Sequence, residues 1–329
     1  VHPTFCYDEV LRQHGDAVDY CVLGEGELTA PELLLAINSG SDISKIRGIA
    51  FRRGDEFVRT APRALIQDLD SLRPAWDLVP WEDYPLYFIA DSHVAIVSSS
   101  RGCIHACSFC SQHKFWRATY RERDPDCFTA EIEMIFREYG VNVFFVADEY
   151  PTRNAQRWER ILDILISKAL PIHLLIETHV NDIIRDAPIL WKYRKAGILF
   201  VYTGVEATEP GRFAMFKKQI GFKKCQEAIR LIKEAGMISE TSLILGVPDE
   251  TPESIRETME TAKLYDPDYM HFLFLAPWPY ADLYPELKPF VDTYDYSKYN
   301  LVEPIIKPRN MTRPQLFEAV LSCYREYYM

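Results

Sequence analysis

The sequence predicts an α/β fold: a (β/α)6 partial barrel, preceded by the last part of a smaller Rossmann-like domain. Two observations support this. From His93 onward, strand-like apolar runs alternate with helix-like segments, which is typical of parallel strands joined by right-handed crossovers. Glycines and ionisable residues follow the ends of successive strands, and a curved sheet would aim them all at one axis. That placement favours a barrel over a flat doubly wound sheet.

Residues 1–40 are expected to be the C-terminal part of an α/β domain. The pattern indicates a helix at 7–14, a strand at 18–23, a glycine-rich turn at 24–27 and a second helix at 31–37. So few strands cannot bury both faces of a sheet. We therefore expect the chain to be part of a longer protein that continues at both ends.

Residues 41–85 are predicted to hold a hairpin and a linker. Two short strands at 48–51 and 56–60 would pair across Arg53–Asp55, and the prolines of 62–85 are typical of a connecting segment.

Residues 86–284 form the predicted partial barrel, and residues 285–329 begin a C-terminal region. Strands are expected near 93–98, 142–147, 172–177, 198–203, 239–246 and 269–275. Helices are expected between them near 126–139, 153–168, 185–196, 221–235 and 252–265.

The composition is that of a folded enzyme. The chain has 329 residues, of which 48% are hydrophobic, and this is enough for a sizeable core. Because 37 Lys and Arg stand against 48 Asp and Glu, and no helix carries a basic run, we expect no nucleic-acid partner. No apolar stretch is long enough to span a bilayer, and the scattered cysteines fit a reducing compartment. We therefore expect a cytoplasmic protein.

Cys103, Cys107 and Cys110 form a tight cluster directly after the first barrel strand. Three thiolates from one loop can hold a [4Fe–4S] cluster and leave one iron open for a substrate or cofactor. Two alternatives remain: a structural zinc site completed by His105 or His113, and cysteines that only pack in the core.

The segment Cys103-Ile-His-Ala-Cys107-Ser-Phe-Cys110 resembles the signature of the radical S-adenosylmethionine (SAM) enzymes. In that family the open iron binds SAM, and an aromatic residue precedes the third cysteine, as Phe109 does here. Further segments resemble the cobalamin-dependent members of the family, and among these the anaerobic oxidative cyclases of chlorophyll-type pigments: residues 107–116, 144–149, 277–283 and 296–300. The resemblance extends over essentially the whole chain.

The resemblance places the SAM contacts at the ends of the strands. Asp148 and Glu149 end the second strand, where the family carries an acidic group that accepts hydrogen bonds from the SAM amino group. The implied set is Phe109, Asp148, Glu149, Thr178, His179, Gly204, Glu206 and Gly246. His179 stands where relatives often have arginine, and Thr241 or Ser242 stands where glycine is usual. Ordinary solvated strand ends remain the alternative for several of these residues.

The resemblance also implies a cobalamin site and a tetrapyrrole substrate. The loop and turn expected near the corrin contribute His2, Gly24, Glu25 and Gly26. The aromatic rings expected to stack on a flat substrate are Trp116, Tyr150, Trp278 and Tyr280. Core packing is the alternative for these rings.

The implied activity is that of an oxygen-sensitive radical SAM oxidoreductase. It would close the fifth ring of magnesium-protoporphyrin IX monomethyl ester, with electrons from a donor such as flavodoxin or ferredoxin. A cobalamin-dependent radical SAM methyltransferase is the alternative enzyme, because the same cofactor motifs serve both reactions. A zinc-bound interaction module, colourless and indifferent to SAM, is the alternative outside the enzymes.

Overall fold

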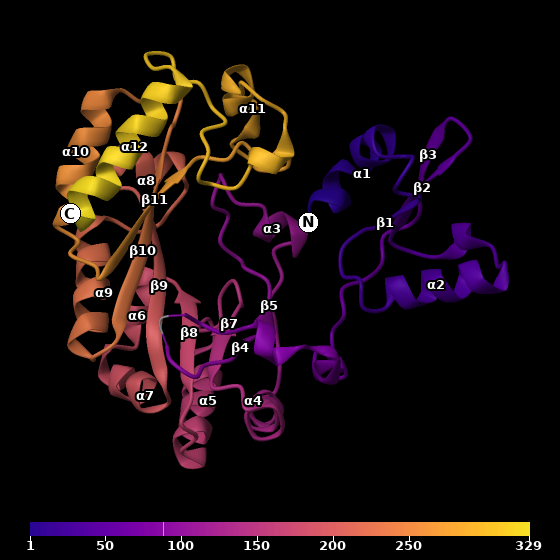
Figure 1. Cartoon of the computed structure of the whole chain (residues 1–329), viewed down its shortest axis with the longest axis horizontal. Coiled ribbons are helices and arrows are strands. Elements are labelled where there is room, and N and C mark those ends of the chain that lie inside the picture. The colour runs from indigo at the N-terminus through magenta and orange to yellow at the C-terminus, as the bar shows by residue number, and fades with distance from the viewer. Residues whose placement is uncertain (88) are drawn as a thin grey trace.

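The computed structural model describes residues 1–87 and 89–329. A small N-terminal unit, indigo in Figure 1, lies beside a larger sheet that is covered by helices. The chain ends in helix α12 (Arg313–Tyr328), which packs beside α10. Among the described residues, no helix has the length and apolar character needed to cross a membrane.

The N-terminal unit is a three-stranded antiparallel sheet, in the order β1-β2-β3, with a helix on each face. Its elements are α1 (His2–Gln13), β1 (Tyr20–Val22), α2 (Thr29–Ser39), β2 (Ile49–Arg53) and β3 (Glu56–Arg59). Leu11 of α1 packs with Ala50, and Leu33 of α2 packs with Ile49 and Phe51, because successive strand residues point to opposite faces. The short strand and the hairpin, which the sequence placed in separate regions, therefore share one sheet.

The larger unit is a six-stranded parallel sheet in the order β11-β10-β9-β8-β7-β4. The strands are β4 (Val94–Val97), β7 (Val143–Val146), β8 (His173–Thr178), β9 (Ile198–Glu206), β10 (Ile238–Leu245) and β11 (Tyr269–Phe274). All six predicted strands are present in the predicted parallel arrangement, so the mixed α/β fold is confirmed.

The helices that follow these strands bury the outer face of the sheet. They are α4 (Pro125–Tyr139), α5 (Ala155–Lys168), α6 (Val180–Arg185), α7 (Leu190–Lys195), α8 (Pro210–Met215), α9 (Phe222–Glu234) and α10 (Pro252–Lys263). In β8, Leu174 and Ile176 are buried in the main core, whereas Leu175 and Glu177 alternate with them and face the inner side. The inner side therefore carries ionisable groups at the ends of the strands.

One predicted helix is broken in the structure. The segment predicted as a helix at 185–196 starts at the last residue of α6, continues as a 3-10 turn (Ala187–Ile189) and is α-helical again only in α7. Pro188 lies in the turn, where it can donate no backbone hydrogen bond and restricts the residue before it. This proline explains why a single helix does not form.

Two tyrosines of α12 bond to the backbone of β11. The Tyr324 hydroxyl accepts from the amide of Phe272 and donates to its carbonyl, at 3.0 and 3.2 Å. The Tyr328 hydroxyl makes the same two bonds to Met270, at 2.8 and 2.9 Å. These four bonds fix α12 to the last strand of the sheet.

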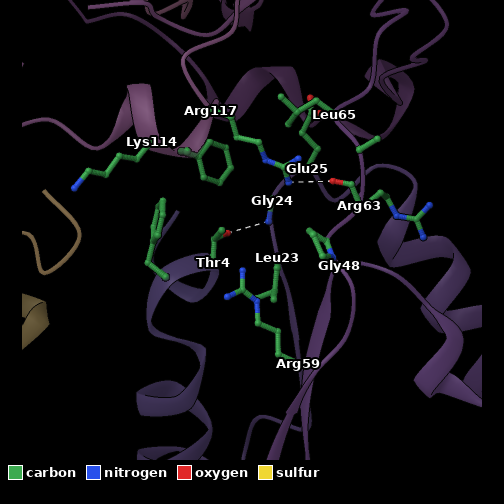
Figure 2. A pocket seen from close by; sticks show the side chains of 14 residues that line it. Thr4, Leu23, Gly24, Glu25, Gly48, Arg59, Arg63, Leu65, Lys114 and Arg117 are labelled. Carbon is green, nitrogen blue, oxygen red and sulfur yellow. Dashed lines mark hydrogen bonds between the residues drawn. The ribbon is translucent and has the colours of Figure 1, made fainter. Parts of the chain in front are cut away.

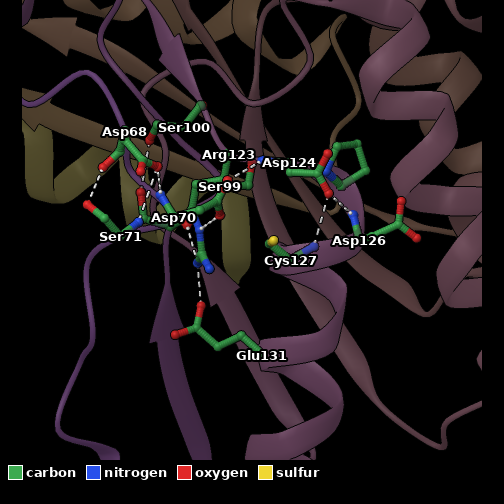
Figure 3. A network of polar contacts seen from close by, with 12 residues as sticks. Asp68, Asp70, Ser71, Ser99, Ser100, Arg123, Asp124, Asp126, Cys127 and Glu131 are labelled. Carbon is green, nitrogen blue, oxygen red and sulfur yellow. Dashed lines mark hydrogen bonds and ion pairs between the residues drawn. The ribbon is translucent and has the colours of Figure 1, made fainter.

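The segment that joins the two units is fastened to the barrel through Asp70 (Figure 3). The Asp70 carboxylate accepts from Arg123 Nε at 2.9 Å and from the Asp124 amide at 2.7 Å. Arg123 also pairs with Glu131, and Asp124 caps the start of α4 by accepting from the Cys127 amide. The N-terminal unit is thus held beside the barrel by charged bonds from the connection itself.

Candidate active site

The three clustered cysteines lie on a loop between β5 (Ser100–Arg101) and the short helix α3 (Gln112–Phe115). Gly102 begins this loop with φ +106°, and a Cβ there would lie 2.2 Å from the Thr119 carbonyl oxygen, so glycine is required. The side chain of Ser108, within the loop, donates to the Met215 carbonyl at 2.6 Å. The loop is therefore anchored to the end of α8 as well as to its own strand.

The thiols of Cys103, Cys107 and Cys110 are partly buried and lie near one another. Burial raises the pKa of all three, that of Cys110 to about 11. Such thiols stay protonated at neutral pH unless a metal takes the place of the proton. A metal centre bound here would therefore displace the thiol protons.

The spacing of the sulfur atoms fits an iron–sulfur cluster better than a zinc ion. Zinc needs all its ligands around one ion, whereas a four-iron cube spreads its thiolates over different irons. Within the described part of the chain, the three Sγ atoms do not all lie within 4.8 Å of one another. His113 lies 3.9 Å from Asp282 instead of completing such a site. The donor set fits a cluster with one open iron.

A buried ion pair lies beside the cysteines. Lys218 Nζ is 3.2 Å from Glu206 Oε1 and donates to the Gly204 carbonyl at 3.1 Å. Burial lowers the pKa of Lys218, but its surroundings, with the charge of Glu206 as the largest opposing cause, raise it above its ordinary value. A Cβ at Gly204 would lie 2.4 Å from Glu206 Oε1, so this glycine lets the carboxylate turn back toward the lysine. Lys218 was not predicted as a site residue, because no sequence motif marks it.

Asp148 and Glu149 have different surroundings. The fully buried Asp148 carboxylate accepts from the Ser99 amide, the Ser99 hydroxyl and the Ser100 hydroxyl, at 2.5–2.7 Å. These bonds hold the turn between β4 and β5, and the SAM contact expected of Asp148 stays a prediction. Glu149 accepts from the Gly102 amide at 3.1 Å and from Trp116 Nε1 at 2.6 Å, and it reaches a cavity.

The mouth cavity, lined by Phe109, Cys110, Glu206, Trp278 and Tyr280 among others, has a volume of about 340 Å³. It brings one cluster cysteine together with two expected SAM residues and two expected substrate rings. Its other lining residues are largely apolar and include Ile244, Leu273 and Leu275. A cavity with apolar walls and a few polar groups is typical of a site for an organic cofactor.

Three other expected SAM residues serve local structure. His179 caps α6, where its Nδ1 accepts from the Asn181 amide at 3.2 Å, and burial lowers its pKa to about 3. A neutral ring cannot grip a carboxylate as arginine would. The Thr178 hydroxyl bonds to Thr152 at 2.5 Å, and the Gly246 amide donates to Glu250 at 3.1 Å.

Two cavities lie between the N-terminal unit and the barrel. The interdomain cavity, about 540 Å³, brings the turn at Gly24, Glu25 and Gly26 together with Trp116 and Glu149. The N-terminal cavity, about 190 Å³, is shown in Figure 2, where Arg59 and Arg117 lie close to Gly24. The amide of Gly24 donates to the Thr4 hydroxyl at 2.9 Å. Most of the residues expected at the corrin thus face the barrel.

Glu25 and His2 are engaged in contacts of their own. Glu25 is buried and accepts from Arg101 at 2.7 Å, from Arg121 at 2.9 Å and from the Ile66 amide at 2.8 Å. This carboxylate joins the turn to two barrel arginines, and its oxygens are occupied. The His2 ring lies 4.6 Å from the Tyr296 ring and 6.0 Å from Tyr280.

Glu177, on the inner side of β8, has a raised pKa. Burial, and then the charges of Glu240, Glu149 and Glu206, raise its pKa from 4.5 to about 7. The folded protein therefore binds this proton more tightly than the unfolded chain does. The stability that the proton contributes is fully present below about pH 4.5 and is lost as the pH rises through about 7.

We expect Glu177→Gln to remove this pH dependence. We compare the unfolding temperature of the variant with that of the unchanged protein at each pH. The difference should favour the variant more at about pH 8 than at about pH 5, because glutamine carries no charge to bury. Thermal unfolding of both proteins across this pH range measures the difference. Parallel curves would show that Glu177 has an ordinary pKa.

The comparisons with known proteins agree with this geometry. The model of the radical SAM superfamily matches residues 97–262. Two anaerobic magnesium-protoporphyrin IX monomethyl ester cyclases, from Cereibacter sphaeroides and Rubrivivax gelatinosus, are 39% and 38% identical to this chain over its whole length. The alignments cover 54% and 60% of those relatives, so the chain spans little more than half of their length.

Solved structures share the fold at low sequence identity. The radical SAM methyltransferase TsrM from Kitasatospora setae has a TM-score of 0.71 at 20% identity, over 84% of this chain and 55% of that one. The cobalamin-dependent SAM radical enzyme OxsB has a TM-score of 0.62 at 15% identity, over 79% of this chain and 38% of that one. At these sequence identities, the two structures show that the fold is shared.

Proposed function

The chain belongs to the radical SAM superfamily, and from this premise we propose that it closes the fifth ring of magnesium-protoporphyrin IX monomethyl ester by oxidation. The observation that carries the proposal is the similarity to two relatives named as this cyclase over the whole chain, cavity-lining segments included. The geometry supports it, since Cys110, the Glu206 carboxylate and several aromatic rings line one cavity.

Membership of the superfamily implies a [4Fe–4S] cluster and SAM. Cys103, Cys107 and Cys110 are the residues that would hold the cluster, which supplies the electron for cleaving SAM and thereby starts radical chemistry. We propose that Glu149 and Glu206 bind the polar groups of SAM and that Phe109 contacts its apolar part.

The chain's own part in this chemistry is to position groups and exclude water. Glu206 is held from both sides, by Lys218 at one oxygen and by the Ser242 hydroxyl at the other, 3.1 Å away. A carboxylate fixed in this way presents its remaining lone pairs in one direction. The rings of Trp278 and Tyr280, stacked at 6.2 Å, wall the same cavity against solvent.

We further propose that cobalamin binds against the N-terminal unit, at the interdomain cavity. This rests on the turn at Gly24–Gly26, which lines that cavity, and on the cobalamin bound in solved structures of TsrM and OxsB. Gly24 has φ +81° with nothing within 4 Å of the position its Cβ would take, so a flat ligand can approach the backbone there. The electron donor and a cytoplasmic location stay predictions.

The methyltransferase alternative also has a specific observation behind it. An uncharacterized methyltransferase of Pyrococcus horikoshii is 28% identical over the whole chain, and the bacteriochlorophyllide d C-8(2)-methyltransferase of Chlorobaculum tepidum is 27% identical over 70% of it. The latter acts on a tetrapyrrole, so the two reactions share a class of substrate.

Product analysis distinguishes the two reactions. The chain, reconstituted without oxygen, would be incubated with reductant, SAM, cobalamin and magnesium-protoporphyrin IX monomethyl ester, and the tetrapyrrole examined by mass spectrometry. A cyclase gives a product that has lost hydrogen and gained oxygen from isotopically labelled water, whereas a methyltransferase adds a methyl group. The Cys107→Ala protein is the matched control. A methylated product would overturn the cyclase proposal.

A further inference from the structure

A fourth cavity lies at the other end of the cysteine loop from the mouth cavity. This side cavity has a volume of about 700 Å³ and is lined by Ile104, Tyr120, Arg121, Tyr150 and Arg153 among others. Ile104 lies between Cys103 and Cys107, so a molecule in the side cavity would touch the loop that carries the cluster. The cavity is open to solvent on one side, which suits the edge of a ligand too large to be enclosed.

Arg121 brings unsatisfied donors to the side cavity. Its guanidinium is only 7% exposed, and one nitrogen, Nη1, donates to Glu25. The other two, Nε and Nη2, are buried and have no hydrogen-bond partner among the described residues. Buried donors without partners are uncommon in folded proteins. Each of the two has less than 1 Å² of exposed surface, so a ligand could bond to them only after the side chains around them shift.

Arg153 adds a second guanidinium that lacks a counter-ion within the described part of the chain. It lies over the ring of Tyr120, 4.8 Å from the centroid, just before α5. The nearby carboxylate of Glu122 is already engaged, by Asn154 at 2.9 Å and by Arg157 at 3.9 Å. The side cavity therefore offers an exposed cation over an aromatic ring.

The other arginines of this segment are occupied elsewhere. Arg123 pairs with Asp70 and Glu131, and Arg117 lines the N-terminal cavity, where it donates to the Arg63 carbonyl at 3.0 Å. Only Arg121 and Arg153 of this group line the side cavity. Arginine binds carboxylates through two parallel bonds, which makes it selective for that group.

We propose that the side cavity binds the free carboxylate of the tetrapyrrole substrate, and that Arg153 selects ligands that carry this group. The inference rests on the proposed function. A monomethyl ester of a dicarboxylic porphyrin keeps one free carboxylate, which Arg153 would bind. The rings of Tyr120 and Tyr150 would contact the flat macrocycle beside it. The esterified side chain is then directed along the cysteine loop.

Ligands that differ only in esterification test this inference. The chain would be titrated with magnesium-protoporphyrin IX monomethyl ester and with the dimethyl ester, and binding followed by the shift of the porphyrin absorption band. Arg153→Gln should weaken binding of the monomethyl ester by roughly ten- to a hundredfold, as expected for a lost charge-assisted hydrogen bond, and leave the dimethyl ester unchanged. Arg153→Lys should recover only part of the affinity.

Arg160→Gln is the matched control, because it removes the same charge from an exposed residue of α5 that pairs with Asp126 at 3.4 Å, away from the cavity. Its binding should equal that of the unchanged chain. Equal affinity of the unchanged chain for both esters, together with unaltered binding by Arg153→Gln, would overturn the inference and leave the proposed function standing. Failure of every tetrapyrrole to bind would overturn both.

Discussion

Replacing Cys107 by alanine is expected to abolish iron binding as a cluster and, with it, all cleavage of SAM. The three cysteines share one anchored loop, and burial keeps their thiols protonated unless a metal binds. Removing one of three ligands leaves a second iron without a protein ligand. The unchanged protein, reconstituted without oxygen, should be brown and hold about four irons per chain. Iron analysis and the yield of cleaved SAM measure the loss, and Cys103→Ala and Cys110→Ala should behave alike.

The chain offers two matched controls for this experiment. Cys127 is exposed on α4, and Cys225 is fully buried in α9, and neither belongs to the loop. Their alanine variants should keep the full iron content, because a single cysteine in these positions contributes packing at most. Stoichiometric zinc in place of iron would contradict the assignment of the site.

Lys218→Met is expected to destabilise the protein by about 3–5 kcal/mol, since it leaves the Glu206 carboxylate buried without its cation. Both side chains are only 10% exposed, so water replaces the lost partner only in part. SAM affinity should fall as well, because Glu206 would no longer be held in one position. Urea unfolding and SAM titration measure the two effects.

The neighbouring Lys217 supplies the control. It is 56% exposed and pairs with Asp282 at 3.2 Å, so the identical substitution, Lys217→Met, should change stability little. A double variant, Glu206→Gln with Lys218→Met, should recover much of the stability but not the SAM affinity, because no uncompensated charge remains buried. If Lys217→Met and Lys218→Met were equally mild, the ion pair would not be buried in solution.

The barrel could be predicted from the sequence because its signals are local. Each strand is a short apolar run, and the alternation with helices fixes the parallel arrangement. The predictions failed where the structure depends on contacts between residues that are far apart in the sequence. Whether residues 20–22 pair with the hairpin depends on a register 29 positions away, as in Cys21 with Ala50. The break at Pro188 could have been predicted from the sequence, because proline lacks the backbone N–H that a helix interior needs.

The site divides in the same way. The cysteines were recognised because three ligands stand within eight residues, whereas Lys218 has no local signal and acquires its role only when α8 carries it to Glu206. Asp148 and Glu149 look alike in sequence, and only the hydroxyls of Ser99 and Ser100 distinguish the buried carboxylate from the accessible one. Local motifs thus identify the ligands of a centre, and folding identifies what holds them.

The two tyrosines of α12 also have a consequence for how the molecule behaves among its own copies. β11 ends the sheet, and the exposed backbone of a terminal strand readily recruits strands from other molecules, which leads to aggregation. Tyr324 and Tyr328 occupy the amides and carbonyls of Phe272 and Met270 that such a strand would need. A chain shortened before α12 would lose this protection, so its solubility, rather than its cofactor binding, would suffer first.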